Sequence, residues 1–209
     1  MARFTDPVYL REEQYKTPTN LSARSGLHER FSTAAGSWHM WVMDQLDLRA
    51  GERVLEVGGG PGWLWRENAD WLPAGLRVCF SDFSLGMLRA ARAGLTGLHG
   101  FGFANSDAQD LPLPAGGFDW VIANHMLYHV PDLPRAVREL ARVLRPGGRL
   151  CAATNGGQHM CELDRLLHQF DARYPEPDQM AAMLRYRLEN AAEWLRPVFG
   201  RVEVRTRCG

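Results

Sequence analysis

Apolar stretches alternate with helical patterns through the middle of this chain. Five short, mostly apolar stretches predict strands, at Arg53–Val57, Leu76–Ser81, Phe101–Ala104, Phe118–Ala123 and Arg149–Thr154. Helical patterns lie between most of them, over residues 62–72, 85–94 and 133–144. Continuous apolar strands that alternate with helices are typical of a parallel sheet covered on both faces. The pattern therefore predicts a doubly wound α/β fold, which binds ligands at the carboxyl ends of its strands.

The alternation stops at both ends of the chain. Helices are expected near the N-terminus, over Asn20–Phe31 and 37–48, and after the fifth strand within 155–170, Gln179–Arg187 and Asn190–Leu195. A final strand is expected at Arg201–Arg207. We therefore predict a single domain, 1–209, made of an N-terminal helical lid, a core, a lid insertion and a last helix with its strand; the bounds are 1–48, 49–155, 156–187 and 188–209.

Composition narrows the possible functions. The chain has 24 Lys and Arg against 24 Asp and Glu, and this balance argues against a nucleic-acid partner. The four cysteines form no C-x-x-C pair, so neither a zinc site nor a disulfide framework is indicated. No apolar run is long enough for a signal peptide or a membrane span, so we expect a soluble, cytoplasmic protein with no membrane partner.

The end of the first strand carries the strongest chemical signal. Glu56 lies near its tip, and a turn with glycines at 58, 60 and 62 leads into a helix. Glycine has no Cβ, so a ligand can approach the backbone amides of such a turn. A carboxylate beside bare amides suits a ligand with an amine, hydroxyls and a purine. The alternative is a turn that only lets the helix pack closely on the strand.

Further polar residues follow the next strands. Asp82 lies 20 residues after Gly62, where a carboxylate can accept the hydroxyls of a ribose. It could instead cap the helix that begins near Ser84. Asp107 follows the third strand and could accept from an adenine amine, or it could be a solvated loop acid. Asn124 and His125 follow the fourth strand and would project into the same crevice.

Over residues 50–155 these motifs, in order, resemble the class I methyltransferases that use S-adenosylmethionine. The segments 127–132 and 145–148 are similar to the branch that acts on small molecules. The resemblance implies that residues 49–155 form a cofactor-binding core and that the acceptor is a small molecule. The lid carries Tyr15, Arg24 and His28, and in similar members of the family it often reaches the cofactor carboxylate, for which Arg24 is the candidate by its charge. The expected cofactor-binding residues are Arg24, Glu56, Gly58, Gly60, Gly62, Trp65, Asp82, Phe83, Met87, Asp107, Ala108, Gln109, Asn124 and His125.

Methyl transfer from a sulfonium requires mainly that the nucleophile be held in line, with removal of its proton where needed. The expected catalytic bases are His125 and His159, because imidazole titrates near neutrality. His129 is four residues from His125, and we interpret it as a hydrogen-bonded or surface histidine. No third ligand accompanies this pair, so no metal site is predicted. If the nucleophile is an electron-rich carbon or already deprotonated, no base is required.

Three other functions compete with this hypothesis. A non-catalytic protein could keep the cofactor site without turnover. A nicotinamide-dependent oxidoreductase would need G-x-G-x-x-G, but counting from Gly58 or Gly60 places Trp63 or Trp65 at the last position. A nucleic-acid substrate is disfavoured by the balanced charge.

The C-terminal end of the sheet is expected to differ from that of the family. The family adds two strands after the fifth, and its last strand is expected to be missing here. The strand edge left free by this absence would favour a homodimer.

Overall fold

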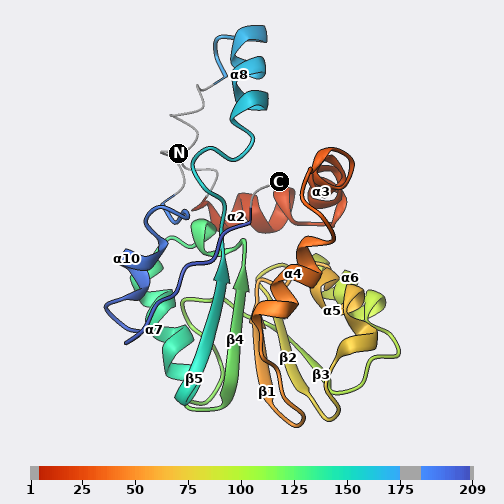
Figure 1. Ribbon diagram of the computed structural model, residues 1–209, viewed down its shortest axis with the longest axis vertical. Helices are drawn as coiled ribbons and strands as arrows, with labels where there is room; N and C mark the ends of the chain where they lie inside the picture. The colour runs from red at the N-terminus through yellow and green to blue at the C-terminus, as the bar shows by residue number, and fades with distance from the viewer. Residues whose placement is uncertain (1–4, 175–184, 208–209) are drawn as a thin grey trace.

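The computed structural model describes residues 5–174 and 185–207, and its centre is a five-stranded sheet (Figure 1). The strand order is β3-β2-β1-β4-β5, and every neighbouring pair is parallel. The strands are β1 Arg53–Val57, β2 Arg77–Asp82, β3 Phe101–Asn105, β4 Phe118–Asn124 and β5 Leu144–Ala153. The order reverses between β1 and β4, so the carboxyl ends of these two strands flank the crevice where such sheets bind ligands. The predicted doubly wound, Rossmann-like fold is confirmed.

Helices cover both faces of the sheet because alternate strand residues point to opposite sides (Figure 1). Val54, Phe80 and Ile122 face one cluster, with the helices α4 Trp38–Gln45, α5 Trp63–Glu67 and α6 Leu85–Gly94. Leu55 and Val121 face the other, with α7 Leu133–Val143 and α10 Ala191–Leu195. A short 3-10 helix, η2 Ala69–Trp71, follows α5.

The helix α7 shows how the sequence pattern determines packing. Its buried residues recur at spacings of three and four, at Leu133, Ala136, Val137, Leu140 and Val143. The carboxylate of Asp132 accepts a hydrogen bond from the Arg135 amide at 3.0 Å and caps the first turn. Each fully buried Leu or Val side chain contributes roughly 1.5–3 kcal/mol. One stripe of apolar residues thus fixes this helix against β4 and β5.

The end of the chain departs from the sequence expectation. No strand is assigned over 201–207, although Val202 and Val204 alternate with charged residues as a strand would. Within the described chain, the backbone of this segment makes no hydrogen bond to β5. Its side chains hold it instead: Arg207 donates to the Ser37 carbonyl at 2.8 Å and Arg205 donates to Gln45 at 2.8 Å. The expected helix at Gln179–Arg187 lies largely outside the described residues.

β5 is also longer than expected. It begins at Leu144, directly after α7, and its pairing with β4 shifts register between Phe118 and Trp120. Pro146, Gly147 and Gly148, a sequence that usually forms a turn, therefore lie inside the strand as an irregularity. β5 pairs with β4 alone among the described strands, so one of its edges is free.

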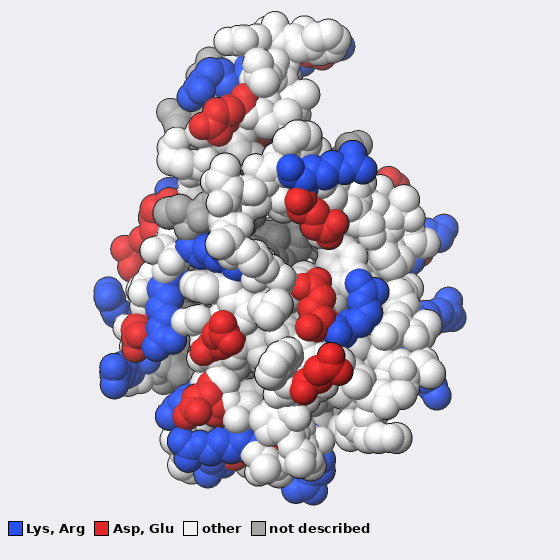
Figure 2. Space-filling view, turned by 45° about the vertical axis from the view of Figure 1, so that its right-hand side comes forward, with Lys and Arg blue, Asp and Glu red and all other residues white. Residues whose placement is uncertain are grey.

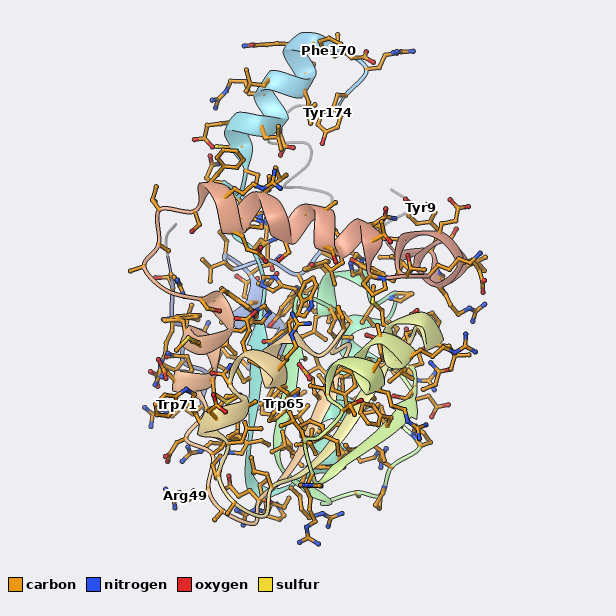
Figure 3. The ribbon with its side chains drawn as sticks, turned by 90° about the vertical axis from the view of Figure 1, so that its right-hand side faces the viewer. Tyr9, Arg49, Trp65, Trp71, Phe170 and Tyr174 are labelled. Atoms are coloured by element: carbon orange, nitrogen blue, oxygen red, sulfur yellow. The ribbon has the colours of Figure 1, made fainter. Side chains whose placement is uncertain are left out.

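The N-terminal segment crosses the carboxyl ends of the strands (Figure 1). It consists of α2 Pro7–Tyr9, a π-helix, η1 Leu10–Gln14, and α3 Thr19–Phe31. α3 has no buried residue. A further helix, α8 Cys161–Phe170, projects away from the body, and its last residue, Phe170, is 92% exposed (Figures 1 and 3). None of the helices in the described part of the chain is long and apolar enough to cross a bilayer.

Candidate active site

A large cavity opens at the carboxyl ends of the strands, with a volume of about 1640 Å³. The loops that follow β1 to β4 form its floor, and the N-terminal segment forms its roof. It also extends along β5 toward the 201–207 segment. All of the predicted site residues except Gly62 and Trp65 line it. The fold therefore gathers residues from distant parts of the sequence around one space.

Hydrogen bonds hold the glycine turn after β1 in shape. Gly58, Gly60 and Gly62 have φ of 67°, 60° and 80°, the left-handed region that favours glycine. The Gly60 amide donates to Asp82 Oδ2 at 2.9 Å. A Cβ added at Gly60 would point into the cavity, 3.5 Å from Leu21 of α3. The turn therefore presents bare backbone to whatever occupies the cavity.

Asp82 joins this turn to the next helix. Its Oδ1 accepts from the Ser84 amide at 2.7 Å, and Ser84 Oγ then caps α6 by accepting from Gly86 and Met87. Ser84, not Asp82, is therefore the capping residue. Asp82 is 8% exposed, and burial raises the pKa of its carboxylate to about 6. Each of its oxygens keeps capacity for a further donor beyond these backbone amides.

Glu56 and Trp65 form a buried pair beneath the turn. Trp65 Nε1 donates to Glu56 Oε2 at 2.5 Å, and Trp65 has no exposed surface (Figure 3). Trp65 therefore belongs to the core and contacts Phe101, which corrects its expected place beside a cofactor. Burial raises the pKa of Glu56 to about 8, while the Trp65 hydrogen bond opposes the shift. Trp63, two residues earlier, is the tryptophan of this turn that lines the cavity.

Gly62 also has a structural place. It is the N-cap of α5, and a Cβ there would come within 3.0 Å of the Leu95 side chain. Its absence from the cavity wall follows from this packing. The sequence does not distinguish Gly62 from Gly58 and Gly60, because all three positions need glycine for the same reason, a left-handed backbone.

The loop after β3 is ordered by its own side chains. Asp107 Oδ1 accepts from the Gln109 amide at 2.8 Å, and the Gln109 side chain donates to both Asp107 oxygens. Gln109 Oε1 in turn accepts from the Asp132 amide at 2.8 Å. Ala108 is 4% exposed between them. Ser106 Oγ is buried without a hydrogen-bond partner among the described residues, which suits a loop that completes its bonding with a ligand.

The tip of β4 carries similar features. Both polar atoms of the Asn124 side chain are buried without a partner among the described residues. His125 has φ of 51°, and its amide donates to the Ala153 carbonyl at 2.9 Å, which directs the chain back from the strand. Its ring lies 4.8 Å from that of Trp38. Burial, followed by the nearby His159, lowers the pKa of His125 to about 4, so its imidazole is neutral near pH 7.

Contacts that the sequence did not indicate anchor the roof. Tyr15 Oη and His129 Nε2 form a hydrogen bond of 2.8 Å, and Arg24 donates to the same hydroxyl at 3.1 Å. His129 is thus hydrogen-bonded, as expected. The Tyr15 carbonyl accepts from Ser84 Oγ at 2.6 Å. The sequence places Tyr15 in the lid, but a partner 114 positions away leaves no local pattern from which this contact could be predicted.

A group of histidines lines the upper part of the cavity. His28 of α3 stacks on His159, and His39 Nδ1 lies 2.9 Å from Glu67 Oε1. Among the described residues, no group of three His, Cys, Asp or Glu side chains could hold a metal ion. The face of the molecule drawn in Figure 2 carries interspersed acidic and basic residues.

Comparison with known proteins shows which families and enzymes this chain resembles. Residues 55–152 match a family model described as a methyltransferase domain. The chain is 37% identical over 117 residues to a ubiquinone/menaquinone biosynthesis C-methyltransferase of Hahella chejuensis, a match that covers 54% of this chain and 47% of the relative. It is 33% identical over 156 residues to the methyltransferase GfsG of Streptomyces halstedii, covering 73% of this chain and 52% of the relative. The chain thus spans about half the length of these curated relatives.

A solved structure agrees in fold. Phosphoethanolamine N-methyltransferase 2 of Haemonchus contortus, in complex with S-adenosyl-L-methionine, aligns with a TM-score of 0.66 and 22% identity. The alignment covers 93% of this chain and 44% of that one. At this identity the likeness concerns the fold alone, and the cavity lies at the strand ends that the fold makes available.

Proposed function

From the membership of this chain in the class I S-adenosylmethionine-dependent methyltransferases, we propose that the cavity binds S-adenosylmethionine and a small-molecule acceptor, and that the protein moves a methyl group to an oxygen, nitrogen or carbon of that acceptor. The observation that most strongly supports this proposal is the hydrogen bond between the Gly60 amide and Asp82. It fixes a bare backbone turn and a buried carboxylate side by side on the cavity floor.

The residues present fit the cofactor. Gly58 and Gly60 leave room along the turn, and Asp82 has acceptor capacity for ribose hydroxyls. Asp107, Ala108 and Gln109 form the adjoining loop, where Ser106 Oγ lacks a partner in the described chain. Phe83 and Met87 line the same side. The unsatisfied side chains of Ser106 and Asn124 would be completed by polar groups of a bound molecule.

At the other end of the site, Arg24 is the proposed partner of the cofactor carboxylate. It lines the cavity from α3, and the hydrogen bond to Tyr15 orients its guanidinium. A guanidinium matches a carboxylate in charge and geometry. Because Arg24 belongs to the roof, this contact would couple cofactor binding to the position of α3.

When bound, S-adenosylmethionine supplies a methyl group that its sulfonium already makes electrophilic. The protein then has to orient the acceptor, exclude water and, where the nucleophile carries a proton, accept it. His125 and His159 are the proposed bases, since both line the cavity and a neutral imidazole can accept a proton. The low pKa of His125 makes it a weak base, which favours nucleophiles that need little deprotonation.

Calorimetry with S-adenosylhomocysteine, followed by transfer of a labelled methyl group to a panel of small acceptors, tests this function. Heat of binding and labelled product are expected. Binding without transfer to any acceptor would favour the non-catalytic alternative, and competition by NADH would favour the oxidoreductase. Absence of binding to a well-folded sample would refute the cofactor assignment.

We extend the proposal to the organisation of the chain. Residues 1–48 and 156–187 would act as lid segments over the cofactor core 49–155, and 188–209 would complete the domain. The free edge of β5 supports pairing of two copies in a homodimer, because an unpaired strand edge presents backbone donors and acceptors. Sedimentation that found only monomer at high concentration would refute this pairing.

A further inference from the structure

The roof of the cavity contains a pair of histidines that come from distant parts of the sequence. The rings of His28 and His159 are stacked, with centroids 5.1 Å apart and planes inclined by 21°. His28 comes from α3, and His159 from the segment that follows β5. Neither imidazole forms a hydrogen bond or an ion pair with another residue of the described chain. Two polar rings therefore face the cavity with unused donors and acceptors.

The helix that carries His28 presents a polar stripe to the cavity. Leu21, Arg24, Ser25 and His28 all line it, at spacings of three and four that place them on one face of α3. Only Leu21 in this stripe is apolar. An acceptor that contacts this face would therefore meet hydrogen-bonding groups.

Several charged groups line the cavity near His28 and His159, but none of them forms an ion pair with either ring in the described chain. α3 contributes Arg24 and Glu29, the tip of β4 contributes His125, and α8 contributes Asp164. On α4, His39 is already paired with Glu67. The pKa of His159 is lowered by burial and then by His28, while Asp164 opposes the shift. Without an added anion, the neighbouring His28 ring thus disfavours protonation of His159.

Aromatic rings form the adjoining wall. Trp38 lies 4.8 Å from the ring of His125, and Trp63 lies 6.1 Å from that of His39. Both tryptophans line the cavity. Flat rings of this kind pack well against an aromatic ligand, by offset or edge contacts.

We propose that the acceptor is a small aromatic carboxylate, with its ring against Trp38 and its carboxylate held by His28 and His159. This inference rests on the proposed function and names its substrate class; with His159 bound to the carboxylate, His125 is left as the proposed base. Two adjacent imidazoles can donate to the two oxygens of one carboxylate, and the negative charge favours protonation of at least one ring. The carboxylate serves recognition, so no bond to it forms or breaks, and the added proton comes from solvent.

Benzoate and its neutral counterpart benzamide test the proposal on protein saturated with S-adenosylhomocysteine. Benzoate is expected to bind at least about tenfold more tightly than benzamide, a difference of about 1.4 kcal/mol. The imidazole resonances of His28 and His159 should shift on benzoate addition, and calorimetry in buffers of different ionisation enthalpy should detect proton uptake.

Two variants complete the experiment. His28→Phe keeps a stacking ring but removes both nitrogens, and should abolish the preference for benzoate while leaving the affinity for S-adenosylhomocysteine unchanged. His99→Phe, at an exposed position before β3, is the matched control and should keep the preference. Equal affinity for the two probes, or no binding of benzoate at millimolar concentration, would overturn the inference. If the unmodified protein did not bind S-adenosylhomocysteine, that result would instead refute the proposed function.

Discussion

The floor and the roof of the cavity are built in opposite ways. On the floor, Glu56 and Asp82 are 2% and 8% exposed, and each has a hydrogen bond to a neighbouring element. On the roof, α3 has no buried residue at all. It is held through Tyr15 and through the His28 ring, which are polar contacts at its borders.

This difference separates two tasks. A floor that is hydrogen-bonded in advance loses little freedom when a ligand binds, which favours recognition of one invariant molecule. A roof without core packing can open and close at small cost, because few buried apolar contacts oppose its movement. We therefore expect substitutions on the floor to affect both stability and cofactor binding, and substitutions on the roof to affect binding alone.

Gly60→Val should produce the largest effect. A valine at φ of 60° is strained by about 1–3 kcal/mol, and its side chain would project into the cavity toward Leu21. Affinity for S-adenosylhomocysteine, measured by calorimetry, should fall more than about a hundredfold, or about 2.7 kcal/mol. Gly102→Val is the control, because a Cβ at Gly102 in β3 meets no atom within 4 Å. Unchanged affinity in the Gly60 variant would remove the turn from the site.

Asp82→Ala follows in size. It removes the acceptor of both the Gly60 and the Ser84 amides, and hydrogen bonds to a charged group contribute about 1.5–3 kcal/mol each. Affinity should fall roughly ten- to a hundredfold, and the melting temperature should fall as well. Asp70→Ala, at an exposed position in η2, should change neither. A variant that binds normally would show that Asp82 only braces the turn.

The contrast between floor and roof also explains how far the sequence could predict the molecule. β1 was predicted to the residue, and the acids at the strand tips were located, because glycine turns and apolar strands are local patterns. Tyr15 and His28 act through partners more than a hundred positions away, which no local pattern records. Trp65 was misplaced because spacing after a turn does not reveal which side of the helix faces the core.

The end of the chain shows the converse error. Residues 201–207 alternate like a strand, yet a strand forms only where a neighbour pairs with it. Here the arginines bond to α4 and the loop before it. Tertiary contacts overrode the local pattern, as they often do for short segments.

The buried acids of the floor should make the free energy of unfolding depend on pH. The folded pKa values are about 8 for Glu56 and about 6 for Asp82, above their ordinary values of 4.5 and 3.8. The folded state therefore keeps protons that the unfolded state releases, and the free energy of unfolding should fall as the pH rises through these intervals. The slope reaches at most about 1.4 kcal/mol per pH unit for each group.

Glu56→Gln removes the larger part of this dependence. Its amide oxygen can still accept from Trp65, so packing should be preserved. Urea unfolding from about pH 5 to about pH 8 should give a flatter profile than that of the unmodified protein, with a gain in stability at the alkaline end. An identical slope in both proteins would mean that Glu56 is ionised in the folded state.

Tyr15→Phe tests the roof and should have the smallest effect. The change removes the hydroxyl that joins His129 to Arg24, at a cost of about 0.5–1.5 kcal/mol for a lost hydrogen bond. Because the aromatic ring stays in place, the melting temperature should hardly move, while affinity for S-adenosylhomocysteine falls about three- to tenfold. Tyr9→Phe, whose hydroxyl bonds to Gln14 within the same N-terminal segment, should leave affinity unchanged. A drop in stability without a drop in affinity would contradict this role of Tyr15. The Tyr15 hydroxyl would then stabilise the fold itself, and α3 would be held in place independently of the ligand.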